Sequence, residues 1–319
     1  MAQNLEAGVD TAASTFADRL ADAVDAKRSQ LLVGLDPRPD LLPVELRGET
    51  HLSRGAAADA CARFCRGLID AVSPYVVGVK LQVAFFEALG SDGLRAYEEV
   101  CDYARAATLL VVADGKRGDI GSTARAYADA YLEAGEDGRL PVDALTVNPY
   151  LGSDSVEPFL AACRRSGAGI FCLVKTSNAG SADIQDLALS DGRRVWQQVA
   201  ELVNEWGSGL VGKRGLSSVG AVVGATYPRA VAEARRLMPQ AVLLLPGIGA
   251  QGATPADVAR AFTSGPASAL VPVSRAVIYA FRVDGAGFAR WLGTSTGSGR
   301  SSTSVSRRRP RWCPRPARA

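Results

Sequence analysis

Short runs of apolar residues recur along the chain, and each run leads into a polar, glycine-rich or proline-bearing turn. Near-continuous apolar runs of about five residues are typical of parallel strands that are covered on both faces. Between the runs, apolar residues recur at helical spacing, as at Val195, Val199 and Leu202. The strands predicted from the runs are Leu31–Leu35, Tyr75–Val79, Leu109–Ala113, Ala144–Val147, Ile170–Val174, Val219–Val223, Ala241–Leu245 and Ala267–Val273.

Eight strands that alternate with helices over about 260 residues match the size of a (β/α)8 barrel, the TIM-barrel fold. An earlier helix, from Phe16 to Val24, places Phe16, Leu20 and Val24 on one face and is expected to cap the bottom of the barrel. An open, doubly wound sheet is the structural alternative. We predict an N-terminal extension over residues 1–14, the barrel over residues 15–292, and a disordered tail rich in arginine and serine over residues 293–319.

The net charge of +3 is a property of the tail. Seven of the 36 Lys and Arg residues lie in residues 293–319, which contain no acidic residue, so the rest of the chain has 29 basic and 33 acidic residues. An acidic body does not favour a nucleic-acid partner, and binding of a polyanion would depend on the tail alone.

No segment suggests a membrane or secretory location. No run approaches the ~18 consecutive apolar residues of a membrane span. The first ten residues, MAQNLEAGVD, lack the basic and apolar regions of a secretory signal. We therefore expect a cytoplasmic protein.

The six cysteines and the single histidine, His51, give little support for a metal site. No CxxC pair occurs, and zinc sites are usually built from closely spaced cysteines or from several histidines. We expect reduced and mostly buried thiols, and no metal. One histidine in a polar segment also leaves a Ser-His-Asp mechanism without a recognisable base.

Polar and charged residues follow nearly every predicted strand, and barrels carry their reactive groups at the carboxyl ends of the strands. The chain has only five lysines, and three of them, Lys80, Lys116 and Lys175, are at strand ends. A lysine can donate a proton, whereas an arginine is effectively never deprotonated. Lys80 and Lys116 are therefore candidate reactive groups, while Lys175 could equally well satisfy a local carboxylate.

The densest group of charges is the segment DGKRGDIGST at 114–123. Asp114 and Lys116 are two residues apart, so on an extended strand their side chains share a face. With Lys80 on the neighbouring strand they can form a row of alternating charges, in which the carboxylates favour the protonated form of Lys116. Asp119 is expected in the following loop or first helical turn. A solvated ladder of ion pairs is the alternative.

A glycine-rich segment, PGIGAQG at 246–252, follows the predicted seventh strand. Its Gly247, Gly249 and Gly252 match GxGxxG, but a dinucleotide fold needs this motif after its first strand and an acidic residue about 20 positions later. In barrels, the loops after strands seven and eight often bind phosphate through backbone N–H groups. Arg275, after the eighth run, adds a side chain that suits phosphate. We predict a phosphate site here, with a structural turn that binds no ligand as the alternative.

Seven segments resemble motifs of the orotidine 5′-phosphate decarboxylase family. The segment at 114–123 resembles the family's Asp-x-Lys-x-x-Asp signature, and the likeness extends over about residues 15–292. The longer, type 2 branch of the family is resembled by VGLDPRPD (33–40), GVKLQVAFFE (78–87), LTVNPYLGSDS (145–155), LVKTSN (173–178), PGIGAQG (246–252) and VPVSRAVIY (271–279).

The resemblance implies a cofactor-free homodimer that decarboxylates orotidine 5′-monophosphate to UMP, the last step of de novo UMP synthesis. Lys116 would protonate C6, Asp114 would lie against the substrate carboxylate, and Lys80 would join the charged network. Asp119 and Thr123 would reach into the partner's site. The other implied substrate contacts are Asp36 to the ribose, Ser177 to the pyrimidine, and Gln251 and Arg275, with the loop containing Gly249, to the phosphate.

Two other functions stay open. Magnesium-dependent sugar-phosphate lyases of the same superfamily, such as keto-gulonate phosphate decarboxylase and hexulose phosphate synthase, carry a similar signature. They place a magnesium-binding glutamate near the end of strand two, where this chain has Lys80, whose charge would repel the metal. A non-catalytic sensor of a phosphate-bearing ligand would bind nucleotide without turnover, and it offers no reason for Lys116 between two carboxylates.

Overall fold

The computed structural model describes residues 14–48, 52–135, 138–248 and 253–282. Within these ranges, eight parallel strands form a closed barrel in which neighbours in the chain are neighbours in the sheet, and β8 pairs with β1. Closure excludes the open, doubly wound sheet. The strands are β1 (Leu31–Leu35), β2 (Gly78–Gln82), β3 (Leu110–Arg117), β4 (Ala144–Val147), β5 (Gly169–Lys175), β6 (Ser217–Val223), β7 (Ala241–Leu244) and β8 (Ala269–Val273).

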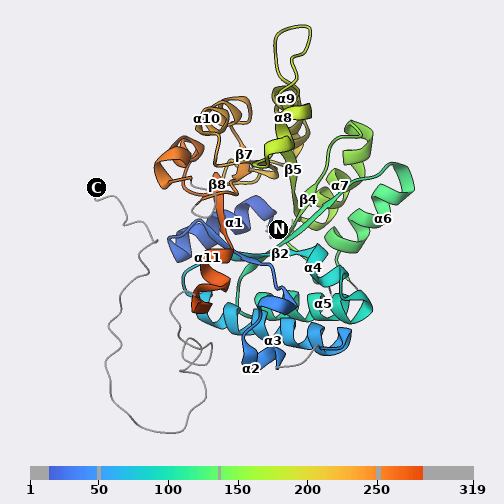
Figure 1. Cartoon of the computed structure of the whole chain (residues 1–319). Coiled ribbons are helices and arrows are strands. Elements are labelled where there is room, and N and C mark those ends of the chain that lie inside the picture. The colour runs from blue at the N-terminus through green and yellow to red at the C-terminus, as the bar shows by residue number, and fades with distance from the viewer. Residues whose placement is uncertain (1–13, 49–51, 136–137, 249–252, 283–319) are drawn as a thin grey trace, which may run out of the picture.

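The helices surround the strands (Figure 1). Those of at least ten residues are α1 (Phe16–Lys27), α3 (Arg54–Val72), α5 (Gly90–Ala106), α6 (Gly121–Leu132), α7 (Ser153–Ser166), α9 (Val195–Gly207) and α10 (Pro228–Leu237). Shorter helices are α2 (Val44–Arg47), α4 (Val83–Glu87), α8 (Ala182–Gln185) and α11 (Arg275–Ile278). Short 3₁₀ segments are η1 (Pro39–Leu41), η2 (Ala179–Ser181), η3 (Ser208–Leu210), η4 (Pro255–Phe262) and η5 (Ala280–Arg282).

Helix α1 closes the bottom of the barrel, as the sequence predicted. Its N-cap Thr15 accepts a hydrogen bond from the Asp18 backbone N–H (3.2 Å), which satisfies one of the free donors at a helix start. Phe16 is buried against Phe171 of β5, edge to face, with 5.8 Å between ring centroids. A Cβ at Gly169 would lie 2.4 Å from the Phe16 ring, so this strand start has room only for glycine.

The outer core lies between the strands and the surrounding helices and includes the described cysteines. Cys61 and Cys65 of α3, Cys101 of α5, Cys163 and Cys172 are unpaired and buried. Burial raises the pKa of Cys61, Cys101 and Cys172 to about 12, so these thiols stay protonated and unreactive at neutral pH. The prediction of burial is confirmed for these five residues, and none of them forms a disulfide.

The bounds of β1 and β4 agree with the apolar runs, those of β5, β6, β7 and β8 differ by one or two residues, and those of β2 and β3 differ more. Strand β2 begins at Gly78 rather than Tyr75 and continues to Gln82, while β3 continues to Arg117. The charged residues that were predicted to follow these strands, Lys80, Asp114 and Lys116, therefore lie within them, and Lys80 and Asp114 are paired with residues of the neighbouring strand. Backbone pairing continues past the apolar layer because a ladder depends on main-chain hydrogen bonds rather than on side-chain polarity.

In the ranges above, no helix is long and apolar enough to cross a membrane. The predicted N-terminal extension up to residue 13, His51, and the predicted tail with the end of the barrel domain (residues 283–319) lie outside the described residues.

Candidate active site

A cavity of about 820 Å³ opens at the carboxyl ends of the strands. Residues from nearly every strand end contribute to its wall, as expected for a barrel whose loops on this face carry the chemistry. The lining includes Asp36, Lys80, Gln82, Asp114, Lys116, Thr146, Asn148, Ser177, Gly247, Ser274 and Arg275.

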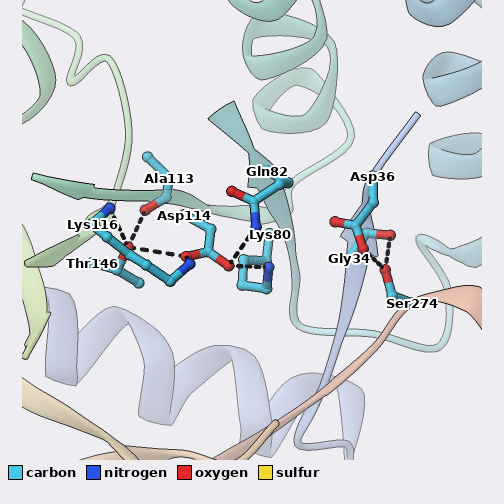
Figure 2. A network of polar contacts seen from close by, with 9 residues as sticks. All are labelled: Gly34, Asp36, Lys80, Gln82, Ala113, Asp114, Lys116, Thr146 and Ser274. Atoms are coloured by element: carbon cyan, nitrogen blue, oxygen red, sulfur yellow. Dashed lines mark hydrogen bonds and ion pairs between the residues drawn. The ribbon is translucent and has the colours of Figure 1, made fainter. Parts of the chain in front are cut away.

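The centre of the cavity wall is Asp114, which lies between two ammonium groups (Figure 2). Its Oδ2 atom is 2.6 Å from Lys80 Nζ, and its Oδ1 atom is 2.5 Å from Lys116 Nζ. Gln82 donates a longer hydrogen bond to Oδ2 (3.3 Å). The predicted row of charges from β2 and β3 therefore exists, with the carboxylate in its middle.

The electrostatics of this cluster favour an anion in the cavity. Burial alone would raise the pKa of Asp114, but the ammonium groups of Lys80 and Lys116 lower it to about 2. Asp114 is thus ionised at neutral pH, and one negative charge faces two positive ones. Lys80 and Asp114 are almost buried, while the Lys116 side chain is 46% exposed, so Lys116 is the cation that a ligand can reach.

The backbone at Lys116 does not follow the regular strand that the spacing argument assumed. Lys116 has φ +46°, in the left-handed region, and the pairing of β3 with β4 shifts between Ala113 and Arg117. A non-glycine residue in this region is uncommon and needs support from its surroundings. Its N–H donates to Thr146 Oγ1 (2.9 Å), and that hydroxyl donates to Asp114 Oδ1 (3.1 Å).

Thr146 is a supporting residue that the sequence interpretation missed. It is 1% exposed in the otherwise apolar strand β4, and it contacts both reactive candidates of β3. A lone hydroxyl in a buried apolar run was the available signal, since Thr146 is two residues before the polar Asn148 and shares its face.

Asp36, at the end of β1, contributes a carboxylate on another side of the cavity (Figure 2). The Ser274 hydroxyl donates to its Oδ2 atom and the Tyr279 hydroxyl to its backbone carbonyl (2.9 Å). A Cβ at Gly34 would lie 2.5 Å from Ser274 Oγ, so glycine allows this close approach. Asp36 Oδ1 is buried and has no hydrogen-bond partner among the described residues, so it can accept a bond from a hydroxyl donor.

The predicted phosphate side is partly described. Arg275, the first residue of α11, lines the cavity together with Pro246, Gly247 and Ile248 from the turn after β7. Gly247 has φ +113°, a conformation that strongly favours glycine. Gly249 and Gln251 lie outside the described residues.

Two predicted site residues, Asp119 and Thr123, do not line the cavity of their own chain. Asp119 Oδ1 accepts from the backbone N–H of Ile120 (2.8 Å), and Thr123 is exposed in the first turn of α6. Lys175 is turned away from the cavity as well, toward Asp186 and Ser181. In the described ranges, no group of three His, Cys, Asp or Glu side chains is placed to hold a metal ion.

The chain is similar to known proteins of one family. The model of the orotidine 5′-phosphate decarboxylase / HUMPS family matches residues 29–283. The chain is 49% identical to the orotidine 5′-phosphate decarboxylase of Rhodopirellula baltica over 84% of this chain and 89% of that protein. It is 45% identical to that of Deinococcus radiodurans, over 85% and 91% respectively.

Among solved structures, Leishmania donovani OMP decarboxylase superposes with a TM-score of 0.65 at 36% identity, over 83% of this chain and 91% of that one. The family match covers all eight strands and every described residue of the cavity wall named above. The chain therefore belongs to the orotidine 5′-phosphate decarboxylase / HUMPS family.

Proposed function

We propose that this chain decarboxylates orotidine 5′-monophosphate to UMP and CO2, the last step of de novo UMP synthesis. The observation that carries the proposal is the ionised Asp114 held between Lys80 and Lys116 on the cavity wall. Relatives that are 49% and 45% identical bear the name of this enzyme. The longer, type 2 branch is the part of the family that the six further sequence motifs support.

Lys116 is the proposed proton donor. When the bond between C6 of the pyrimidine and its carboxyl carbon breaks, CO2 leaves and the electron pair stays on C6. The fixed ammonium of Lys116 stabilises this charge and then gives C6 a proton. The neutral amine recovers its proton from solvent, since the side chain is 46% exposed.

Asp114 and Lys80 prepare this step. Lys80 keeps Asp114 ionised and fixed, and Asp114 orients the Lys116 ammonium at 2.5 Å. A substrate carboxylate beside Asp114 is repelled by it, although destabilisation of the ground state is a contested source of rate enhancement.

The rest of the cavity wall suits a ribose phosphate. Asp36, with its unpaired Oδ1 atom, accepts from the ribose hydroxyls, and Ser177 bonds to the pyrimidine. Arg275, together with Gln251 and the Gly249 loop, binds the phosphate. Binding energy at the phosphate, far from C6, can hold the reacting carbon against Lys116.

The active form that we propose is a cytoplasmic homodimer without metal or cofactor, in which Asp119 and Thr123 complete the partner's site. Neither residue lines its own cavity. Beside them, Ile120, Tyr150 and Leu151 are 57%, 76% and 50% exposed on the loops after β3 and β4. We assign these exposed apolar side chains to the surface that meets the partner.

The alternative within the family is a metal-dependent sugar-phosphate lyase. Such an enzyme needs carboxylates around a divalent cation, but near the end of β2 this chain has Lys80, already paired with Asp114. A second cation at this point opposes metal binding.

The decisive experiment follows the ultraviolet absorbance of orotidine 5′-monophosphate after purified protein is added in excess EDTA. We expect steady conversion to UMP. Conversion in EDTA would also exclude the metal-dependent alternative, whereas absence of conversion by folded, dimeric protein would reject the proposal and favour a sugar-phosphate lyase or a non-catalytic sensor.

A further inference from the structure

Lys175 is a buried lysine at the carboxyl end of β5 that the proposed mechanism does not use. It is 3% exposed, and its Nζ atom lies 2.8 Å from Asp186 Oδ2 and 3.2 Å from Ser181 Oγ. The ammonium also lies over the ring of Tyr227, 4.9 Å from its centroid. A buried ammonium is held firmly by such partners because leaving it unpaired is costly.

The local backbone turns Lys175 out of the cavity. The pairing of β5 with β6 shifts between Leu173 and Lys175, which breaks the alternation of the strand. As a result Leu173, Val174 and Thr176 line the cavity, whereas Lys175 does not. Lys175 is therefore not placed to contact a reacting group.

The partners of Lys175 connect two loops on the same face of the barrel. Ser181 and Asp186 belong to the excursion, residues 176–194 between β5 and α9, which passes through α8 and continues as a hairpin (Figure 1). Tyr227 belongs to the turn between β6 and α10. Lys175 therefore connects the excursion to the turn between β6 and α10.

The excursion contributes a large share of the cavity wall next to the pyrimidine contact. Thr176, Ser177, Asn178, Ile184 and Gln185 all line the cavity. The Gln185 amide holds Thr176 at both its N–H (2.9 Å) and its hydroxyl (2.8 Å).

The backbone of Ser177 is closely packed. The Gly224 N–H donates to the Lys175 carbonyl (2.7 Å), and a Cβ at Gly224 would lie 3.0 Å from both Cα and Cβ of Ser177. The backbone that carries Ser177 is therefore pressed against the turn after β6, directly beside the Lys175 anchor.

We infer that Lys175 is a positioning residue: through Asp186 and Ser181 it holds the excursion so that Ser177 faces the pyrimidine. This inference rests on the proposed function for the identity of the ligand. The ion pair does not take part in proton transfer, so its loss should affect binding of the substrate more than the chemical step.

A double-mutant cycle tests whether Lys175 acts through Ser177. Lys175→Met and Ser177→Ala should each lower kcat/KM for orotidine 5′-monophosphate about tenfold, the effect of one lost hydrogen bond in a buried site. The double variant should also lose about tenfold rather than about a hundredfold, because residues that act as a unit are not additive. In Lys175→Met, KM should account for the loss, and the pH profile of kcat should stay unchanged.

A matched control is Arg19→Met at the bottom of the barrel, where Arg19 pairs with Asp143 at 2.8 Å. This variant should leave KM unchanged. Additive losses in the cycle, or an equal rise of KM in the Arg19→Met control, would contradict the inference. If Lys175→Met does not fold, Asp186→Asn, whose side chain is 31% exposed, replaces it in the same cycle.

Hydrogen exchange separates this inference from the proposed function, because it does not depend on which substrate is used. Amides in residues 176–194 should exchange faster in Lys175→Met than in wild type, and should not do so in Arg19→Met. Unchanged exchange would reject the inference that Lys175 holds the excursion in place. If exchange is faster in Lys175→Met but the wild-type protein fails to convert orotidine 5′-monophosphate, the proposed function is rejected and the inference about Lys175 is kept.

Discussion

Two lysine–aspartate pairs lie on the same face of this barrel and differ in what surrounds them. Lys80 and Asp114 are 2.6 Å apart on the cavity wall, and a second ammonium, Lys116, contacts the same carboxylate. Lys175 and Asp186 are 2.8 Å apart behind the wall, beside a hydroxyl and an aromatic ring. The first group has an excess of positive charge that an anion can reach, whereas the second is balanced and closed to a ligand.

The comparison teaches that burial and a short ion pair do not by themselves identify a reactive lysine. Lys80 and Lys175 are both buried, and in the sequence both come at the end of an apolar run. What separates them is the charge count and access to the cavity: Lys116 is 46% exposed and Lys175 is 3% exposed. A buried, balanced pair holds structure, while an unbalanced pair that faces solvent is prepared for a substrate.

The largest expected effect comes from removing the accessible ammonium. Lys116→Ala should lower kcat by at least about 10⁴-fold, because it removes both the charge that stabilises C6 and the proton that C6 receives. The absorbance assay measures the rate, and circular dichroism with UMP titration checks that fold and nucleotide binding remain. Activity within tenfold of wild type would contradict the conclusion that Lys116 is reactive whereas Lys175 is structural.

A second test asks whether Asp119 of one subunit supplies a second carboxylate to the site of its partner, next to Lys116. Asp119→Ala and Lys116→Ala proteins should each be nearly inactive alone. Unfolded and refolded together in equal amounts, they should recover about a quarter of wild-type activity, since half of the dimers then contain one intact site. No recovery, with mixed dimers demonstrated by differently tagged chains, would mean that Asp119 acts within its own chain or not at all.

The smallest effect concerns stability and its dependence on pH. The two ammonium groups lower the pKa of the buried Asp114 from 3.8 to about 2. A carboxyl whose pKa falls on folding stabilises the folded state above its unfolded pKa, here by about 2 kcal/mol, and this contribution disappears as pH falls from about 4 to about 2. The difference in unfolding free energy between wild type and Asp114→Asn should therefore shrink over that range.

Urea unfolding at several pH values between 7 and 2.5 measures this difference. A gap between the two proteins that stays constant down to the lowest pH would show that Asp114 gains nothing from its neighbours in the folded state.

The sequence was sufficient for the barrel because each strand of a closed parallel sheet is covered on both faces and reads as an apolar run. It predicted the bounds of β1 and β4 as observed. It placed β2 too early, since Val76 and Val77 are buried apolar residues that precede the paired segment. Apolar composition reports burial, whereas strand bounds depend on main-chain pairing with the neighbours.

Within the site, the sequence indicated Asp114, Lys80 and Lys116 because they are charges in unexpected places. For Lys175 it left a reactive and a structural role open, because a shift in strand pairing reverses the direction of a side chain without changing composition. Thr146 was missed for a related reason: its role depends on the left-handed backbone of Lys116, which no spacing rule predicts.

Helix α1 closes the bottom of the barrel, so the two ends of the barrel have separate roles. The Phe16 ring packs against Gly169 at the start of β5, while the cavity wall lies at the opposite ends of the strands. Substrate must then enter and product leave through the same opening of the cavity. Substitutions that improve packing around α1 do not contact the reacting atoms. For protein engineering, the underside is accordingly where heat resistance can be sought first, with the catalytic rim left untouched.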